Sequence, residues 1–456
     1  MIYENNYVKD LKIAYIVGGS RGWAWTLMND LAKTQDMSGT VYLYDIDFDA
    51  ARNNEVIGRK FPGDAWKYQA VKTAEEAMTG ADFVIVSILP ATFDEMEFDV
   101  HAPEKYGIYQ SVGDTAGPGG FFRALRTVPM MREIAANVRK YCPNAWVINY
   151  TNPMAVCIGA LYREFPEIRA YGCCHEVFGT QTLLSHALEE IEGIEDVSRR
   201  EIAVNVVGVN HFTWFTSAYY RNLDLFEVYT RFIDKYYESG YNRKGLGNWM
   251  NDFFASDARV RMDLFRRFGY IAAAGDRHLA EFMDFEDYLR DCKKWSFALT
   301  PVSWRKNNLK ERLARSERLL SGEEIWELRS TGEEGTLQMR ALLGLDTLVT
   351  NINIPNQGQI ANLPYGAVVE SNAVFRSGSL LPVMAGNVPD SIYPLVSRAA
   401  YENKITLDAA FSQDLSYAYE KFAELNLLKS LKTEEKKELF ETMCKGTEKY
   451  LGAYKK

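Results

Sequence analysis

Four consecutive residues offer the most recognisable chemistry in this chain. Cys174-His175-Glu176-Val177 place a thiol beside an imidazole and a carboxylate, directly after an apolar run. The chain has 5 His among its 456 residues, and another of them, His211, also follows an apolar run. A Cys and a distant His could bind a divalent metal ion in a site that stays partly open for substrate. The alternative is a buried free Cys that packs as a small hydrophobic residue, which is the commoner role of that residue type.

Polar, glycine-rich loops follow three of the expected strands. They are Gly113–Gly120, Asn149–Pro153 and the segment at Cys174. Ligands of open α/β sheets gather outside the carboxyl ends of the strands. Each loop could be ordinary, but three of them at successive strand ends favour the rim of an active site.

One further segment gathers charged and polar side chains behind a run of small residues. Asp276-Arg277-His278 follow Ala272–Gly275, and Glu281 comes three residues later. These residues could take part in catalysis. Asp276 could equally be the N-cap of a helix, because Asp is a favoured cap.

A glycine-rich turn near the N-terminus suggests a dinucleotide site. A strand at 12–17 leads into Gly18-Gly19-Ser20-Arg21-Gly22 and a helix at 24–33, and Asp45 ends the next apolar run. Such glycines let the backbone approach a pyrophosphate at the helix N-terminus, and the acidic residue binds a ribose, which favours NAD over NADP. The fingerprint is imperfect because Val17 stands where its first glycine belongs. The alternative is a tight turn without a ligand.

The expected elements alternate between strands and helices as far as about residue 200. This order predicts an α/β fold with a Rossmann-like, doubly wound parallel sheet. The length predicts two domains, and the pattern changes at about residue 200. We therefore expect an NAD-binding domain at 1–200 and an α+β domain for substrate binding and oligomerisation at 201–456. Further strands are expected at 41–44, 81–87, 145–149, 168–173, 202–207 and 214–220, and helices at 123–141, 226–237, 312–328 and 427–456.

Composition narrows the range of partners and of compartments. The net charge is -9 and no basic stripe stands out, so no nucleic-acid partner is expected. No apolar run approaches the ~18 residues that a membrane span needs, and no secretory signal is recognisable at the start. The 6 Cys show no spacing typical of disulfides. The prediction is a cytoplasmic protein.

These motifs together resemble the family 4 glycoside hydrolases, which depend on NAD and on a divalent metal, usually Mn2+. The resemblance implies a fold related to that of lactate and malate dehydrogenases. The resemblance runs through nearly the whole chain in the family's order. It includes the Gly18-Gly19-Ser20 turn, Asp45, Gly113–Gly120, Asn152-Pro153, Cys174-His175, Gly208–Trp214, Gly275-Asp276 and Asn353–Gly358.

The resemblance implies a role for several residues. The metal ligands fall on Cys174 and His211, the substrate-contacting Asn falls on Asn152, and the catalytic base falls on Asp276. His175 after the Cys resembles the branch that acts on unphosphorylated α-linked sugars, and Cys-His-Glu-Val resembles the α-galacturonidases. The nucleotide is assigned to Gly18, Gly19, Ser20 and Asp45, and the sugar to Asn152, His175, Glu176, Arg277 and His278. Of these, His175, Arg277 and His278 are the candidates for the cation that a galacturonate carboxylate needs.

The implied reaction is hydrolysis of α-linked galacturonides by NAD-dependent oxidation at C3, metal-assisted elimination across C1 and C2, addition of water and re-reduction. The resemblance to this family also implies a homodimer or a homotetramer. Three alternatives remain open at this point. They are an α-galactosidase or α-glucosidase of the same family, an NAD-dependent hydroxy-acid or polyol dehydrogenase that needs neither Cys174 nor a metal, and a regulatory protein that binds the cofactor without turnover.

Overall fold

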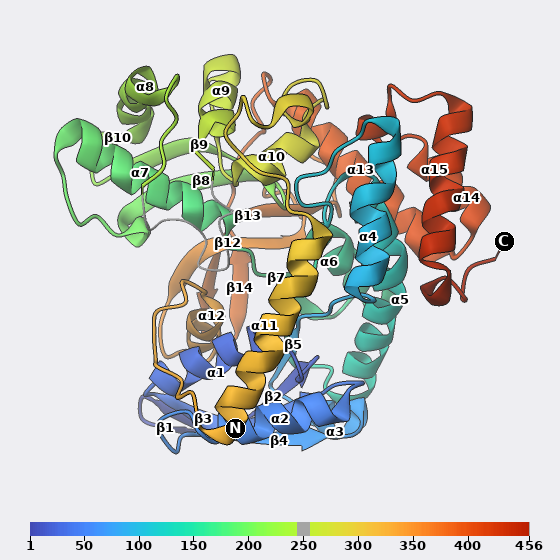
Figure 1. The fold of residues 1–456 in the computed structure, drawn as a ribbon. Coiled ribbons are helices and arrows are strands. Elements are labelled where there is room, and N and C mark those ends of the chain that lie inside the picture. The colour runs from blue at the N-terminus through green and yellow to red at the C-terminus, as the bar shows by residue number, and fades with distance from the viewer. Residues whose placement is uncertain (244–255, 456) are drawn as a thin grey trace.

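A computed structural model describes residues 1–243 and 256–455, and a large twisted sheet runs through its centre (Figure 1). Six of its strands are parallel and lie in the order β4-β3-β2-β5-β6-β7. This is the strand order of the dinucleotide-binding fold, so the predicted Rossmann-like α/β architecture is confirmed. These strands are β2 (Tyr7–Ile16), β3 (Met37–Tyr44), β4 (Trp66–Val71), β5 (Phe83–Val86), β6 (Trp146–Asn149) and β7 (Arg169–Gly172), and β1 (Ile2–Glu4) pairs with β2.

Both faces of this sheet are buried, which explains the apolar strands. Along β2, Ala14 and Ile16 belong to one hydrophobic core, whereas Ile13 and Tyr15 belong to a second core on the opposite face. All of β5 is buried, as expected for the middle of a parallel sheet. The covering helices include α1 (Trp23–Lys33), α2 (Phe48–Gly58), α3 (Ala74–Met78), α4 (Phe93–His101), α5 (Gly117–Tyr141), α6 (Met154–Glu164) and α12 (Gly335–Leu342).

Three strands from late in the sequence extend the same sheet beyond β7. They are β12 (Leu348–Pro355), β13 (Val368–Arg376) and β14 (Ser379–Pro382), and all of them pair antiparallel. Sequence reasoning did not find these strands. The large sheet therefore takes strands from both sides of residue 200, and the division into domains at 1–200 and 201–456 stays a prediction.

A second, smaller sheet belongs to the middle of the chain. It contains β8 (Ile202–Val209), β9 (Phe212–Tyr220), β10 (Leu223–Asp224) and β11 (Ile271–Ala272). Figure 1 shows this sheet with α7 (Glu176–Glu192), α8 (Leu225–Tyr236), α9 (Arg259–Phe268) and α10 (Asp276–Phe282) at the end of the molecule opposite β4 and α2. The Phe226–Tyr237 helix and the two strands expected in this region are thus present, with ends shifted by a few residues.

The last helices pack beside α4 and α5 (Figure 1). They are α13 (Tyr393–Ser412), α14 (Leu415–Phe422) and α15 (Thr433–Gly446), so the predicted tail at 427–456 is helical only in part. The helix expected at 312–328 is α11 (Val302–Ser321), which ends at Gly322 because that residue adopts a φ of 85°.

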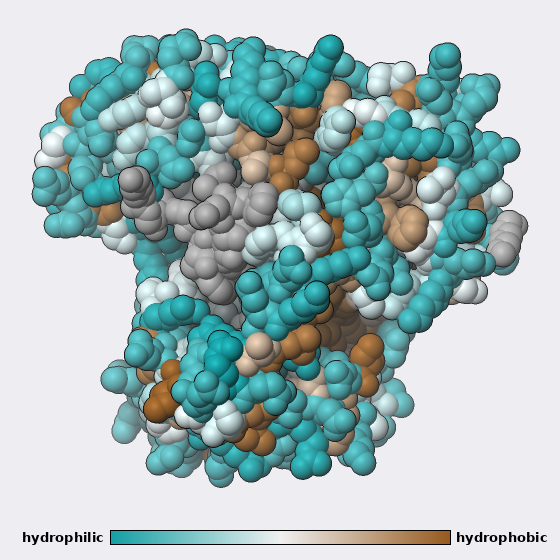
Figure 2. All heavy atoms as spheres, in the orientation of Figure 1, coloured by the Kyte–Doolittle hydropathy of each residue, from teal (hydrophilic) through white to brown (hydrophobic). Residues whose placement is uncertain are grey.

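Hydropathy varies along the helices and over one face of the molecule. Of the helices in the described ranges, none combines the length and the hydropathy that crossing a bilayer requires. Figure 2 shows a mainly hydrophilic face with hydrophobic residues gathered in a recess near the middle.

Candidate active site

The turn between β2 and α1 is tight and rich in glycine. Val17 adopts a φ of 73°, a left-handed conformation that is costly for a β-branched residue. An added Cβ would lie 2.6 Å from the Leu43 backbone at Gly18, and 2.5 Å from Ala50 at Gly19. The missing glycine of the fingerprint is therefore replaced by a strained valine, and the turn keeps its tight geometry.

Two side chains outside the turn hold it in place. The Gly19 amide donates to Asp45 Oδ2 at 2.9 Å, and the Asp47 amide donates to Asp45 Oδ1 at 2.9 Å. Asn54 on α2 donates to the carbonyls of Gly18, at 2.7 Å, and Ser20, at 3.0 Å. Burial raises the pKa of Asp45, although both amides lower it. The role of Asn54 was not predicted, because no local motif marks a side chain that supports a turn 34 or more residues away in the sequence.

A second cluster lies where the polar loops meet the small sheet. Among the residues that the structure describes, Asp114, His211 and His278 form the group whose potential metal-binding atoms lie within 4.8 Å of one another. The rings of His211 and His278 have centroids 3.9 Å apart. A carboxylate and two imidazoles suit a divalent ion of the first transition row. Sequence reasoning chose His211 as a ligand, but it assigned His278 to the sugar and gave Asp114 no role.

Local backbone geometry explains how His211 reaches this cluster. Val209 of β8 pairs with Phe212 of β9, so Asn210 and His211 form a two-residue turn between the strands. His211 has a φ of 64° there and is 4% exposed. A buried non-glycine residue in that conformation is uncommon, and such strain concentrates at functional sites.

Burial and neighbouring charges set the protonation of the cluster. Burial lowers the pKa of His211 to about 3, and it also lowers the pKa of His278. Burial opposes the ionisation of Asp114, but Arg123 and the neighbouring histidines hold its pKa well below the usual range. Both imidazoles are thus neutral and the carboxylate is ionised at neutral pH, which is the form that metal ligands require.

Glu176 connects the Cys174 segment to the same cluster. Its Oε2 accepts the Gly275 amide at 2.7 Å, and its Oε1 lies 3.9 Å from His278 Nε2. Burial would raise the pKa of Glu176, but His278, His211 and His175 bring it down to about 2. The carboxylate is therefore a fixed negative charge beside the two histidines.

Cys174 lies in a neighbouring network rather than in the group of three. Asn210 lowers the pKa of its thiol, and Asn210 Nδ2 donates to Glu370 Oε2 at 3.3 Å. Asn351 donates to Glu370 Oε1 at 2.6 Å. Burial raises the pKa of Cys174 well above its ordinary value, and the charges of Glu370 and Glu176 add to this effect. Burial also raises the pKa of Glu370 to about 7. Cys174 as a metal ligand stays a prediction.

Asp276 accepts hydrogen bonds from the start of α9. Its Oδ2 accepts the Val260 amide at 3.2 Å, and its Oδ1 accepts the Arg261 amide at 3.2 Å and Arg261 Nε at 3.3 Å. Ala258, the N-cap of α9, offers no side-chain acceptor, so Asp276 supplies it from α10. Asp276 is the first residue of α10, whose N-cap is Gly275. Burial raises the pKa of Asp276, while Arg261 lowers it.

Arg277 and Glu281 hold the loop that carries Asp114. Arg277 Nη2 donates to the Ser111 carbonyl at 2.8 Å. Glu281 Oε1 accepts the amides of Val112, at 2.7 Å, and Gly113, at 2.8 Å. Burial raises the pKa of Glu281 to about 7. The contacts described for Arg277 thus serve the loop, and its predicted contact with a sugar stays a prediction.

The remaining predicted sugar-binding residues lie at the edge of this region. His175 Nδ1 lies 3.1 Å from Glu333 Oε1, and the His175 side chain is 46% exposed. Burial lowers the pKa of His175, but Glu333 more than offsets this and raises it to about 9. Glu333 also lines a cavity of about 550 Å³. Asn152 accepts Arg123 Nε at its carbonyl at 2.9 Å, and its Oδ1 is buried with no hydrogen-bond partner in the described part of the chain.

Two family models match this chain. The family 4 glycosyl hydrolase model matches residues 12–190, and the model of the C-terminal domain of family 4 glycosyl hydrolases matches residues 206–424. The alpha-galacturonidase of Thermoanaerobacterium saccharolyticum is 57% identical over 463 residues, covering 100% of this chain and 99% of the relative.

Solved structures agree with this match. The crystal structure of lplD from Bacillus subtilis has a TM-score of 0.92 and 48% identity, covering 95% of this chain and 100% of the other. A 6-phospho-alpha-glucosidase from gut microorganisms, in complex with NAD and Mn2+, has a TM-score of 0.80 and 20% identity, covering 98% of this chain and 99% of the other, and shows a likeness of fold. The chain belongs to family 4 of the glycosyl hydrolases, as its motifs predicted.

Proposed function

We propose that this glycosyl hydrolase cleaves α-linked galacturonides. The observation that carries the proposal is the 57% identity to an alpha-galacturonidase along the entire chain. The Cys-His-Glu-Val sequence at 174–177, which resembles that branch of the family, supports the same substrate.

NAD is the proposed nucleotide, held by Gly18, Gly19, Ser20 and Asp45. The fit rests on two glycines that leave no room for a Cβ and on a carboxylate placed against the Gly19 amide. Both features let a dinucleotide approach the backbone and leave an acidic group near a ribose.

Mn2+ is the proposed metal. His211 is a ligand both in the pair that the resemblance implies and in the group of three that the structure brings together. Asp114 and His278 supply the other donor atoms of the group described above, and His278 Nδ1 is buried with no hydrogen-bond partner among the described residues. Cys174 remains the further ligand that the family resemblance implies. When bound, the cation would stabilise negative charge on sugar oxygens, and NAD would accept and return a hydride.

Asp276 is the proposed base for the C2 proton. Burial raises the pKa of Asp276, and a base that works near neutrality benefits from such a shift. To act as this base, the Asp276 carboxylate would give up its hydrogen bond from the Val260 amide or from the Arg261 side chain and contact the substrate instead.

His175 is the proposed cation for a galacturonate carboxylate. Its pKa of about 9 keeps it charged at neutral pH, whereas burial lowers the pKa of His278. Glu333 occupies Nδ1, so Nε2 remains to donate. Glu176 and Asn152 complete the proposed sugar contacts.

One assay tests the substrate and the reaction type together. The protein is incubated with 4-nitrophenyl α-galacturonide, NAD and Mn2+ in deuterated water under reducing conditions. We expect nitrophenol release, deuterium at C2 of the product and no net NADH. Release without NAD and metal would contradict the elimination route, and faster release from the matching α-galactoside or α-glucoside would reassign the sugar. Accumulating NADH would favour a dehydrogenase.

Assembly and location are also proposed. A homodimer or homotetramer in the cytoplasm would agree with the resemblance and with the spacing of the 6 Cys. Light scattering of the purified protein measures its oligomeric state directly, and a monomer would contradict the proposed assembly.

A further inference from the structure

Thr115 lies directly behind the proposed metal ligands. Its hydroxyl lies 2.7 Å from Asp114 Oδ1 and 3.0 Å from His211 Nδ1. Thr115 is 8% exposed, so water does not compete freely for either contact. No role was assigned to it by sequence reasoning, because Thr inside a glycine-rich loop is an ordinary turn residue.

The direction of the two hydrogen bonds follows from the hydrogens available. A hydroxyl has one hydrogen to donate and two lone pairs to accept with, and an aspartate carboxylate only accepts. The Thr115 hydrogen therefore goes to Asp114, so its oxygen accepts a hydrogen from His211. That hydrogen must stand on Nδ1, and the lone pair of the neutral ring then stands on Nε2.

We propose that Thr115 is a positioning residue that fixes the tautomer of His211, so that Nε2 is the nitrogen presented to the metal ion. The inference rests on the proposed function only in assuming that the cluster binds a divalent cation. Metal-ligating histidines usually donate their other ring N–H to a fixed acceptor, which orients the ring. Thr115 supplies that acceptor and also ties down one oxygen of Asp114.

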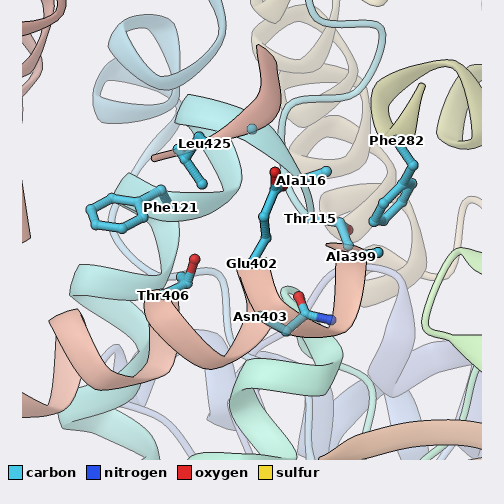
Figure 3. Close-up of a pocket in the computed structure, with 10 residues that line it drawn as sticks. Thr115, Ala116, Phe121, Phe282, Ala399, Glu402, Asn403, Thr406 and Leu425 are labelled. Atoms are coloured by element: carbon cyan, nitrogen blue, oxygen red, sulfur yellow. The ribbon is translucent and has the colours of Figure 1, made fainter. Parts of the chain in front are cut away.

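The surroundings of Thr115 leave room for a clean test. Thr115 lines a small cavity of about 10 Å³ with Ala116, Phe121, Phe282, Glu402 and Thr406. Figure 3 shows Glu402 rising from α13 toward Ala116 at the start of α5, with Thr406 on the same helix. Valine has the shape of threonine without its hydroxyl. Thr115→Val therefore removes the hydrogen bonds and adds no bulk, and Thr406→Val makes the same change in the same cavity.

The first measurement is the affinity of the metal-free protein for Mn2+ by titration calorimetry, without sugar. We expect Thr115→Val to weaken binding by about 10- to 100-fold, the usual cost of losing such a partner. Thr115→Ser keeps the hydroxyl and should stay within about threefold of the natural protein, as should Thr406→Val. Unchanged affinity in Thr115→Val would overturn the inference.

The second measurement needs no variant of Thr115. Nitrogen-15 NMR of labelled histidine distinguishes the two neutral tautomers, and His211→Asn identifies the signal. A hydrogen on Nδ1 supports the inference, and a hydrogen on Nε2 overturns it even if Thr115→Val fails to fold. Because neither measurement uses a sugar, a failure of the galacturonide assay would leave this inference standing and would count against the proposed substrate alone.

Discussion

Asp276→Asn should separate the two roles that the structure and the resemblance give to Asp276. The carboxylate accepts three hydrogen bonds, two of them from Arg261 at Oδ1 and one from the Val260 amide at Oδ2. An asparagine can keep its oxygen toward Arg261, but its NH2 group then faces the N–H of Val260. Val260 is 0% exposed, so its amide is left in a dry environment without the acceptor that the described residues give it.

The expected loss of stability follows from that single amide. A buried donor left without a partner costs about 1–3 kcal/mol. The three hydrogen bonds are long at 3.2–3.3 Å and therefore weak. Burial raises the pKa of Asp276, so its charge is unfavourable there, and removing that charge offsets part of the loss. We therefore expect the lower part of that range, about 1–2 kcal/mol in the free energy of unfolding by urea.

Catalysis supplies the second readout for the same variant. If Asp276 is the base, kcat should fall by about 10²- to 10⁴-fold, and deuterium should no longer enter C2. Arg261→Met is the matched control, because it removes an ion pair with Asp276 but leaves the carboxylate. It should lose stability and keep C2 exchange.

Two outcomes would refute the reasoning, each in a different place. An Asp276→Asn protein as stable as the natural one would show that the carboxylate does not cap α9. A stability loss with kcat within tenfold and with C2 exchange intact would leave the cap in place and remove Asp276 from the chemistry.

Three further expectations concern the turn, the core and pH. Gly18→Ala should weaken NAD binding at least tenfold by calorimetry, because its Cβ would meet the Leu43 backbone at 2.6 Å. Gly179→Ala is the control and should bind NAD normally, because its Cβ would meet nothing within 4 Å. Equal affinities of the two variants would count against the turn as the nucleotide site. Arg126→Met should cost about 3–5 kcal/mol of unfolding free energy because it leaves the Asp99 carboxyl, which is 0% exposed, without its ion-pair partner. Glu286→Gln, in an ion pair on the surface, should cost less than about 1 kcal/mol. Burial raises the pKa of Glu281 to about 7, so its folded form holds a proton that the unfolded chain loses near pH 4. The free energy of unfolding should therefore fall as pH rises from about 4 to 7, by on the order of 2–3 kcal/mol for this group. Glu281→Gln should make this fall, measured by urea unfolding at each pH, less steep but should not abolish it, because burial raises the pKa of Glu370 in the same way. An unchanged pH dependence in the variant would contradict a protonated Glu281.

The sequence was a good guide to the first part of the fold. Parallel strands buried on both faces are continuous apolar runs, and β5 and β6 were recognisable for that reason. The tight turn after β2 was also predicted, although Val17 broke its pattern. The strain at a φ of 73° is a property of the folded backbone, so no pattern of residue types could show it.

Long-range pairing set the limit for the rest. The strands β12–β14 join β7 through a single described residue pair, Asn353 with Gly172, and nothing local marks that contact. The candidate site was limited in the same way. His211 and Asp276 were singled out by their motifs, but whether a side chain turns toward Asp114 or toward the start of α9 depends on how α9 and α10 pack.

The antiparallel extension of the large sheet has a consequence for how the chain is made. During synthesis, β7 is complete long before β12 emerges, since residues 173–347 lie between them. Until then β7 is an open edge with unpaired amides and carbonyls, a template for association with other chains. Pairing over such a sequence separation is slow to form. The part of the sheet that ends at β7 therefore depends on β12, which is made much later, to cover its open edge.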